Sequence, residues 1–139
     1  MFLASREVMD VFRPGDHGST FGGNALAAAV GLAALDVLVQ ERLVERSATM
    51  GEYLLTELRK IRSPLIREVR GRGLWIGVDF DPNRIAARRI AERLLARGIL
   101  SKETHDTVLR LAPPLVVERE QIDWALTQFK AVLEEVNQA

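Results

Sequence analysis

The segment from His17 to Asn24 combines hydroxyl and glycine residues directly ahead of an alanine-rich run that begins at Ala25. Glycine lets the backbone approach a ligand closely, and the hydroxyls of Ser19 and Thr20 can donate hydrogen bonds. A helix that starts after them presents free backbone N–H groups, which attract an anion. The segment therefore predicts a phosphate-binding site. The same hydroxyls could instead cap the first N–H groups of the helix.

Arg110 is the second candidate for chemistry, because it lies near the end of a predicted strand, ahead of the pair Pro113-Pro114. The planar guanidinium of arginine can bind a carboxylate through two parallel hydrogen bonds. An arginine taken alone is more often a solvated surface charge. Lys102 is expected at a strand end in a structural or rim position, and His105 is expected in a turn rather than in acid–base chemistry.

The composition excludes several classes of site. The chain has no cysteine, and its two histidines, His17 and His105, lie far apart, so we expect no disulfide, no thiolate nucleophile and no metal site. Lys and Arg together number 19, as do Asp and Glu, so charge gives no reason to expect nucleic acid or a membrane as partner. The apolar run 25–39 contains Asp36 and is shorter than a membrane span. Together with the absence of a signal-peptide pattern, this predicts a soluble, cytoplasmic protein.

Hydrophobic periodicity and turn residues predict the order of the elements. The predicted helices cover 24–40, 43–61, 81–97 and 118–136, and the predicted strands cover 66–80 (bent by a bulge), 99–102 and 107–111. Ala86, Ile90 and Leu94 form the expected inner stripe of the third helix, and the alanine-rich first helix is expected to pack closely on more than one side. This order predicts an α+β fold, with helices packed on one face of a short, mostly antiparallel sheet.

Three motifs in this order resemble those of the class III, fold type I aminotransferases, which depend on pyridoxal phosphate (PLP). Pro14–Asn24 resembles their phosphate-contacting segment, and Val69–Leu74 resembles the first strand of their small C-terminal domain. Lys102–Leu115 looks most like the ornithine aminotransferases, although its Arg-x-x-Pro-Pro-Leu portion is shared with the acetylornithine aminotransferases. The resemblance covers essentially the whole chain but only about the C-terminal third of such an enzyme.

The resemblance implies a role for each part of the chain. Residues 1–22 would be the phosphate-contacting segment, which belongs to the missing large domain and is expected to be loose. Residues 23–42 would be a connecting helix, and residues 43–139 the small C-terminal domain. Ser19 and Thr20 would bind the phosphate of PLP in the neighbouring subunit of a dimer, so the cofactor would be shared with a partner chain. Arg110 would bind a substrate carboxylate in the glutamate/2-oxoglutarate half-reaction.

The resemblance also implies that this chain holds no catalytic residue. PLP chemistry requires a lysine that forms a Schiff base with the cofactor. The three lysines here, Lys60, Lys102 and Lys130, do not match that lysine, which in the family lies upstream of the phosphate segment. We therefore expect the chain alone to be inactive and not to bind PLP by itself. Its expected partners are an upstream lysine-bearing half, in a homo- or hetero-oligomer, and a small amino acid or oxo acid.

The leading hypothesis is that the chain is the C-terminal part of an ornithine aminotransferase, which transfers the δ-amino group of ornithine to 2-oxoglutarate. If the chain is part of such an enzyme, acetylornithine or another ω-amino acid could be the substrate instead. A second hypothesis is a non-catalytic remnant or binding module that folds alone. A third is a small regulatory domain that binds a free amino acid at Arg110.

Overall fold

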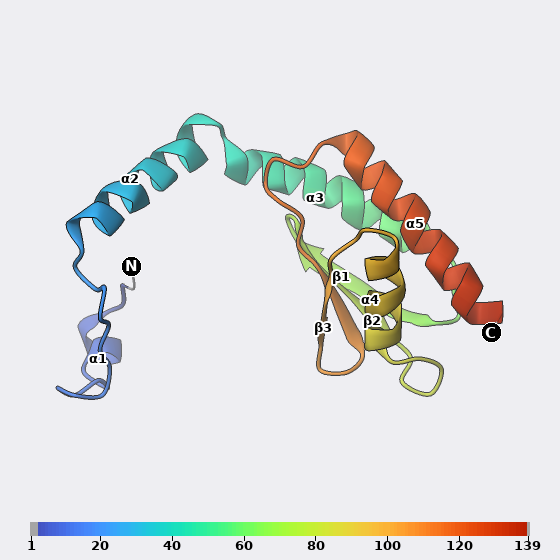
Figure 1. Cartoon of the computed structure of the whole chain (residues 1–139), viewed down its shortest axis with the longest axis horizontal. Coiled ribbons are helices and arrows are strands. Elements are labelled where there is room, and N and C mark those ends of the chain that lie inside the picture. Colours follow the sequence, from blue (N-terminus) through green and yellow to red (C-terminus); the bar gives the residue numbers. More distant parts are fainter. Residues whose placement is uncertain (1–2, 139) are drawn as a thin grey trace. The chain divides into compact units, whose positions relative to one another are not determined.

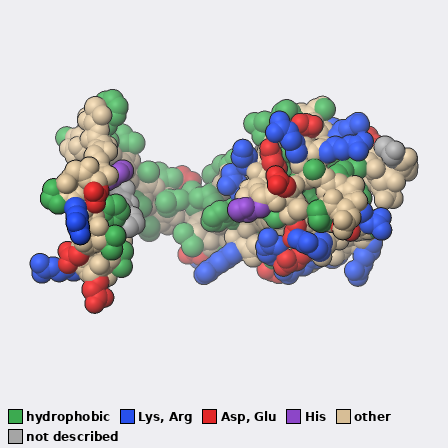
Figure 2. Space-filling view, turned by 90° about the horizontal axis from the view of Figure 1, so that it is seen from below, with side chains coloured by type: hydrophobic (Ala, Val, Ile, Leu, Met, Phe, Trp, Pro, Cys, Tyr) green, Lys and Arg blue, Asp and Glu red, His purple; other side chains and the backbone are tan. Residues whose placement is uncertain are grey.

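The computed structural model describes residues 3–138, and the chain divides into two compact units, Met1–Val37 and Leu38–Ala139. The roles that the resemblance implies for residues 1–22, 23–42 and 43–139 stay predictions. Figure 2 shows basic and acidic side chains interspersed over the surface of the second unit, as the balanced composition leads one to expect.

The first unit contains α1 (Arg6–Met9) and most of α2 (Ala25–Gln40). The single-turn helix α1 has too few residues to show a period, and it was not predicted. Asn24 caps the start of α2, since its Oδ1 accepts a hydrogen bond from the backbone N–H of Ala27 at 3.1 Å. No residue of α2 is buried within the described part of the chain. The close packing expected for this helix is therefore not made here.

The second unit is built on a four-stranded sheet with the order β1-β2-β4-β3, in which every neighbouring pair is antiparallel. Its strands are β1 (Ile66–Arg72), β2 (Trp75–Phe80), β3 (Lys102–Thr104) and β4 (Val108–Leu111). Helices α3 (Leu43–Lys60) and α4 (Ala87–Ala96) pack on this sheet, and α5 (Arg119–Gln138) packs on both helices (Figure 1). The predicted α+β fold, with helices on one face of an antiparallel sheet, is confirmed.

The core lies between this sheet and the helices, and it follows the predicted apolar stripes. Successive strand residues point to opposite faces, so every second residue of β2 and β4 enters the core. The most deeply buried side chains are Leu58, Ile76, Val78, Phe80, Ile90, Leu94, Leu109 and Val132. The residues between them on β2 and β4 are left on the face of the sheet that no helix covers.

The region predicted as one bent strand over 66–80 is in fact the β1–β2 hairpin. Its turn places Gly73 at a φ of +55°, a left-handed conformation that glycine adopts without strain. The glycines of Gly71-Arg72-Gly73 therefore lead into a turn and not into the predicted bulge. Leu74 is buried under the helices, which explains its apolar character within a turn.

The predicted start of the third helix at Asp81 is wrong. The Oδ1 atom of Asp81 instead accepts a hydrogen bond from the backbone N–H of Asn83 at 2.9 Å, which forms a separate turn. Ala86 is extended and exposed, and α4 begins after it, so Ala87 replaces Ala86 on the inner stripe. Strand β3 likewise begins at Lys102, later than predicted.

Candidate functional site

Arg110 lies on the open face of the sheet, at the centre of β4. Its neighbour Leu109 is fully buried against the helices, and alternation along the strand places the Arg110 side chain on the opposite face, where it is exposed. Leu109 faces Val78 across the β2–β4 ladder, and Arg110 faces Gly77. The strand therefore anchors the guanidinium with a buried leucine while presenting it to solvent.

Four residues in register form a row that crosses the whole sheet: Arg70 of β1, Gly77 of β2, Arg110 of β4 and Lys102 of β3. Directly opposed residues of an antiparallel pair share a face, so all three cations of this row project from the open side. We call this set the basic row. A row of cations on one rigid sheet is an arrangement that can bind an anion.

Gly77 leaves a gap in the basic row beside Arg110. A Cβ added to Gly77 would lie 3.2 Å from the Cγ1 atom of Val108, which is closer than an ordinary contact. Because Gly77 has no side chain, no side chain of β2 stands directly opposite Arg110 on the open face. The glycine thus serves the shape of the open face rather than a turn.

Asp79 neutralises the β1 end of the basic row. The Nη2 atom of Arg67 lies 2.5 Å from its Oδ2 atom, and the Nη1 atom of Arg70 lies 3.6 Å from the same oxygen. Burial acts to raise the pKa of Asp79, but hydrogen bonds from Arg67 and Thr107 and the positive charges of Arg67 and Arg70 outweigh it and hold that pKa below its usual value. Glu68 also pairs with Arg70, at 2.6 Å. The charge of Arg70 is thereby matched within the sheet.

The other two cations of the basic row are not matched in this way. Among residues 3–138, Arg110 and Lys102 form neither a hydrogen bond through their side chains nor an ion pair. The acidic residue next to Lys102, Glu103, points to the helix side, where it lies 3.7 Å from Arg88 of α4. The β4–β3 end of the row therefore carries positive charge that is free to bind a carboxylate.

Ser19 and Thr20 lie in an exposed turn of the first unit. Asn24, rather than either hydroxyl, caps α2, and within the described residues neither hydroxyl makes a hydrogen bond. A Cβ added to Gly22 would lie 3.1 Å from the Cβ atom of Ser19, so a side chain at Gly22 would crowd the serine. Asn24 therefore takes the capping role that Ser19 or Thr20 could have had. The two hydroxyls, beside glycine backbone without side chains, are available to donate hydrogen bonds to a phosphate.

The family-model comparison matches residues 1–133 to "Aminotransferase class-III". The chain belongs to the class III aminotransferases. This aminotransferase chain is 60% identical over 129 residues to an ornithine aminotransferase of Staphylococcus carnosus, covering 93% of the chain and 32% of that relative. It therefore spans about a third of the length of the curated relatives that it matches.

Solved structures agree with this assignment. An ornithine aminotransferase from Toxoplasma gondii matches with a TM-score of 0.81 at 41% identity, over 95% of the aminotransferase chain and 32% of that structure. An acetylornithine aminotransferase from Elizabethkingia anophelis matches with a TM-score of 0.79 at 39% identity, over 96% and 36% respectively.

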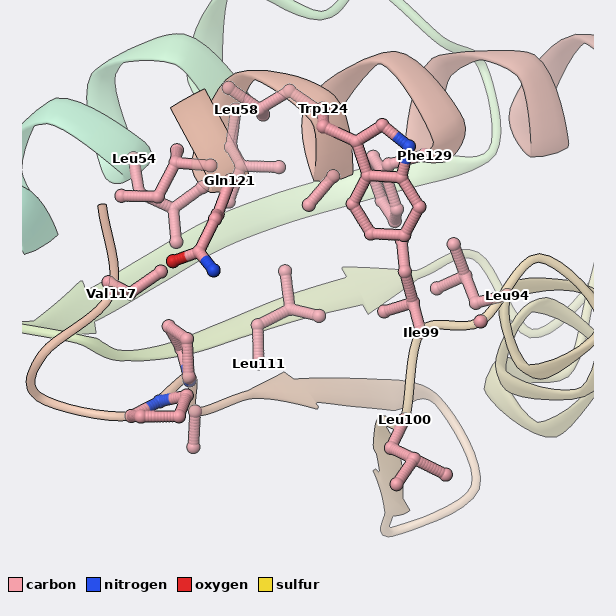
Figure 3. Close-up of a pocket in the computed structure, with 17 residues that line it drawn as sticks. Leu54, Leu58, Leu94, Ile99, Leu100, Leu111, Val117, Gln121, Trp124 and Phe129 are labelled. Atoms are coloured by element: carbon pink, nitrogen blue, oxygen red, sulfur yellow. The ribbon is translucent and has the colours of Figure 1, made fainter. Parts of the chain in front are cut away.

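The aminotransferase chain also has an apolar pocket of about 370 Å³ on the helix side of the sheet (Figure 3). Leu58, Leu111, Trp124 and Phe129 line it, and Gln121 is its one amide side chain. The Oε1 atom of this glutamine already accepts a hydrogen bond from the backbone N–H of Glu118 at 2.9 Å. The lining offers little to a charged substrate. Because Leu111 points into this pocket, Arg110 is on the other face of the sheet and does not serve it.

In residues 3–138 no group of three or more metal-ligating side chains comes together, and no helix there is long and apolar enough to cross a membrane.

No ligand role was assigned to Lys102 from the sequence. Its opposition to Arg110 depends on the pairing of β3 with β4, which residue types alone do not reveal. The strand-like patterns on both sides of His105-Asp106 were the available signal, because they predict a hairpin that brings the two cations together.

Proposed function

We propose that this chain is the C-terminal part of an ornithine aminotransferase, and that it contributes a carboxylate-binding arginine and a phosphate-binding segment to the active site. The observation that carries the proposal is the exposed, unmatched guanidinium of Arg110 on a rigid strand, in a chain 60% identical to an ornithine aminotransferase. A rigid position matters because a bidentate pair requires fixed geometry.

In this proposal Arg110 binds a carboxylate of the amino-acid or oxo-acid substrate. Its two parallel N–H donors would orient the substrate as well as hold it, which a point charge such as an ammonium does less well. The buried anchor Leu109 keeps β4 in register, so that substrate binding need not order the strand. Positioning of this kind is a major source of rate enhancement in enzymes.

Ser19 and Thr20 are proposed to hold the phosphate of PLP, together with backbone N–H groups of the glycine-rich turn. PLP, when bound, supplies the electron sink that amino-group transfer requires. The support on this chain is that both hydroxyls are exposed and free of internal hydrogen bonds in the described region. The Toxoplasma gondii relative has PLP in its active site at partial occupancy.

The lysine that binds the cofactor is proposed to come from the part of the relatives that has no counterpart here, about two thirds of their length. The chain would then act together with that upstream part, within an oligomer in which Ser19 and Thr20 serve a neighbouring subunit. None of the lysines of this chain lies beside the phosphate segment in sequence.

The test is a chimera in which the upstream two thirds of the Staphylococcus carnosus ornithine aminotransferase precede this chain. With PLP, the chimera should show the visible absorbance of lysine-bound cofactor, and that band should change when ornithine is added. The chain alone with PLP should show no such band. A folded chimera that binds PLP but does not turn over ornithine would refute the proposed substrate.

Acetylornithine is the second candidate substrate, favoured by the likeness to the Elizabethkingia anophelis enzyme. The first chimera alone cannot decide between ornithine and acetylornithine, since its upstream part brings its own substrate-selecting residues. A second chimera with the upstream part of that acetylornithine aminotransferase separates the cases. The chain should support turnover better in the context whose substrate it evolved to serve. If neither chimera binds PLP, a non-catalytic binding module becomes the better account.

A further inference from the structure

Lys102 of β3 lies directly opposite Arg110 of β4, on the open face of the sheet. The Cβ atoms of such a pair are about 5 Å apart, and like charges placed in this way repel each other. Within the described residues neither cation has an acidic partner to relieve the repulsion. An anion bound between them would relieve it.

The groups that surround this pair leave the position open to a ligand. Gly77 faces Arg110 from β2 and has no side chain. Asp79, the acidic residue nearest along that strand, is buried and already paired with Arg67. Nothing acidic on the described part of the open face is therefore left to neutralise Lys102 and Arg110 in place of a ligand.

We propose that Lys102 is a specificity-determining residue, which together with Arg110 forms a two-cation subsite for the acidic oxo acid. This inference rests on the proposed function. An oxo acid with two carboxylates is a dianion, whereas ornithine carries two amino groups and one carboxylate. A second cation beside Arg110 strengthens the attraction for the dianion and disfavours ornithine, whose two ammonium groups and one carboxylate give it a net positive charge. Lys102 thereby favours the acceptor substrate without taking part in the chemistry.

The experiment compares Lys102→Gln, Lys102→Arg and the control Lys130→Gln in the Staphylococcus carnosus chimera. Lys130 lies on the exposed side of α5, so its replacement removes the same charge at a distance from the sheet face. Lys102→Gln should raise the KM for 2-oxoglutarate by about three- to fivefold, the effect of one exposed charge. The kcat should stay within about twofold and the KM for ornithine should not rise, because the lost attraction concerns only the dianion.

Two further readouts separate this role from a structural one. Lys102→Arg should restore the KM for 2-oxoglutarate, since charge is what matters. Added salt should raise the KM for 2-oxoglutarate in the parent chimera, because screening weakens the attraction between exposed charges. The KM values of the parent and of Lys102→Gln should therefore come closer together as salt is added. An active chimera in which Lys102→Gln leaves the KM for 2-oxoglutarate unchanged overturns the inference while leaving the proposed function intact.

If the chimera is inactive, the proposed function fails and the subsite is tested on the full chain alone. Glutarate, a dicarboxylate without an amino or oxo group, is titrated while the backbone amide signals of Gly77 and Leu109 are followed by NMR. We expect shifts that saturate at millimolar glutarate and that require at least threefold more of it in Lys102→Gln, but not in Lys130→Gln. Equal titrations in all three proteins, or no shift in any, overturn the inference.

Discussion

Gly51 of α3 lies directly against Gly73 of the β1–β2 turn: a Cβ added to Gly51 would lie 2.1 Å from the carbonyl carbon of Gly73. One turn earlier on α3, the Oγ atom of Ser47 accepts a hydrogen bond from the backbone N–H of Leu74 at 3.2 Å. The hairpin turn is thereby held on the helix by close backbone approach and by one hydrogen bond. This contact fixes the tip of the hairpin relative to the core.

Gly51→Ala should therefore lower the free energy of unfolding by about 2 kcal/mol, since overpacking against backbone outweighs the gain in helix propensity. Chemical denaturation of the full chain, followed by circular dichroism, measures the change. The matched control is Gly31→Ala in α2, where an added Cβ would meet nothing within 4 Å. That variant should gain helicity and lose no stability; equal losses in both variants would contradict the contact.

Thr20→Val removes one hydroxyl from the phosphate segment while keeping the side chain's shape. In the chimera we expect the dissociation constant for PLP to rise about tenfold or more, because a hydrogen bond to a charged phosphate is lost. Absorbance titration measures it. Thr20→Ser keeps the hydroxyl and should bind PLP nearly as well as the parent. If Thr20→Val binds PLP as tightly as the parent chimera does, Thr20 does not contact the phosphate.

Asp79→Asn should lower the free energy of unfolding by about 1–2 kcal/mol near neutral pH, a value reduced because solvent screens the half-exposed Arg67. The pKa of Asp79 is held below its unfolded value, so its contribution to stability is present in full above the unfolded pKa of about 4. It is lost as the pH falls below that value toward the folded pKa. Denaturation at pH 7 and pH 3 should show the two proteins converging at the lower pH, and a constant difference would contradict this.

Arg110→Lys should leave the stability of the chain within about 0.5 kcal/mol, because the side chain is exposed and has no partner among the described residues. In the chimera, kcat/KM for 2-oxoglutarate should fall about 30-fold or more, since an ammonium cannot replace the two-pronged contact with a carboxylate. Steady-state kinetics and thermal unfolding measure the two effects. A stable variant with unchanged kinetics would remove Arg110 from the substrate site.

The long helices were predicted well from the sequence, because their apolar pattern repeats over many turns. The short turns were predicted poorly, because no such repetition supports them. Helices α3 and α5 carry apolar stripes over many turns, and such a repeated signal survives local irregularity. The β1–β2 turn was missed because Leu74, although in a turn, is buried and looks like a strand residue. The start of α4 was misplaced because Asp81 makes its hydrogen bond within a separate turn rather than to a helix.

The site was predictable to a lesser degree. Arg110 and the hydroxyls of Ser19 and Thr20 were identified from residue type and from family motifs, and their roles stay predictions. The basic row was not predictable, because it depends on which residues of four strands come into register. A sequence shows alternation along one strand, but it does not show the neighbour across the sheet.

The β3–β4 turn has a consequence for how this chain tolerates insertion and deletion. Its residues His105 and Asp106 both adopt left-handed backbone conformations, with φ of 52° and 59°. A single residue gained or lost in β4 downstream of this turn would exchange the faces of Leu109 and Arg110, placing a guanidinium in the core and a leucine in solvent. Such a change would disrupt the core and remove the Arg110 guanidinium from the open face in one step.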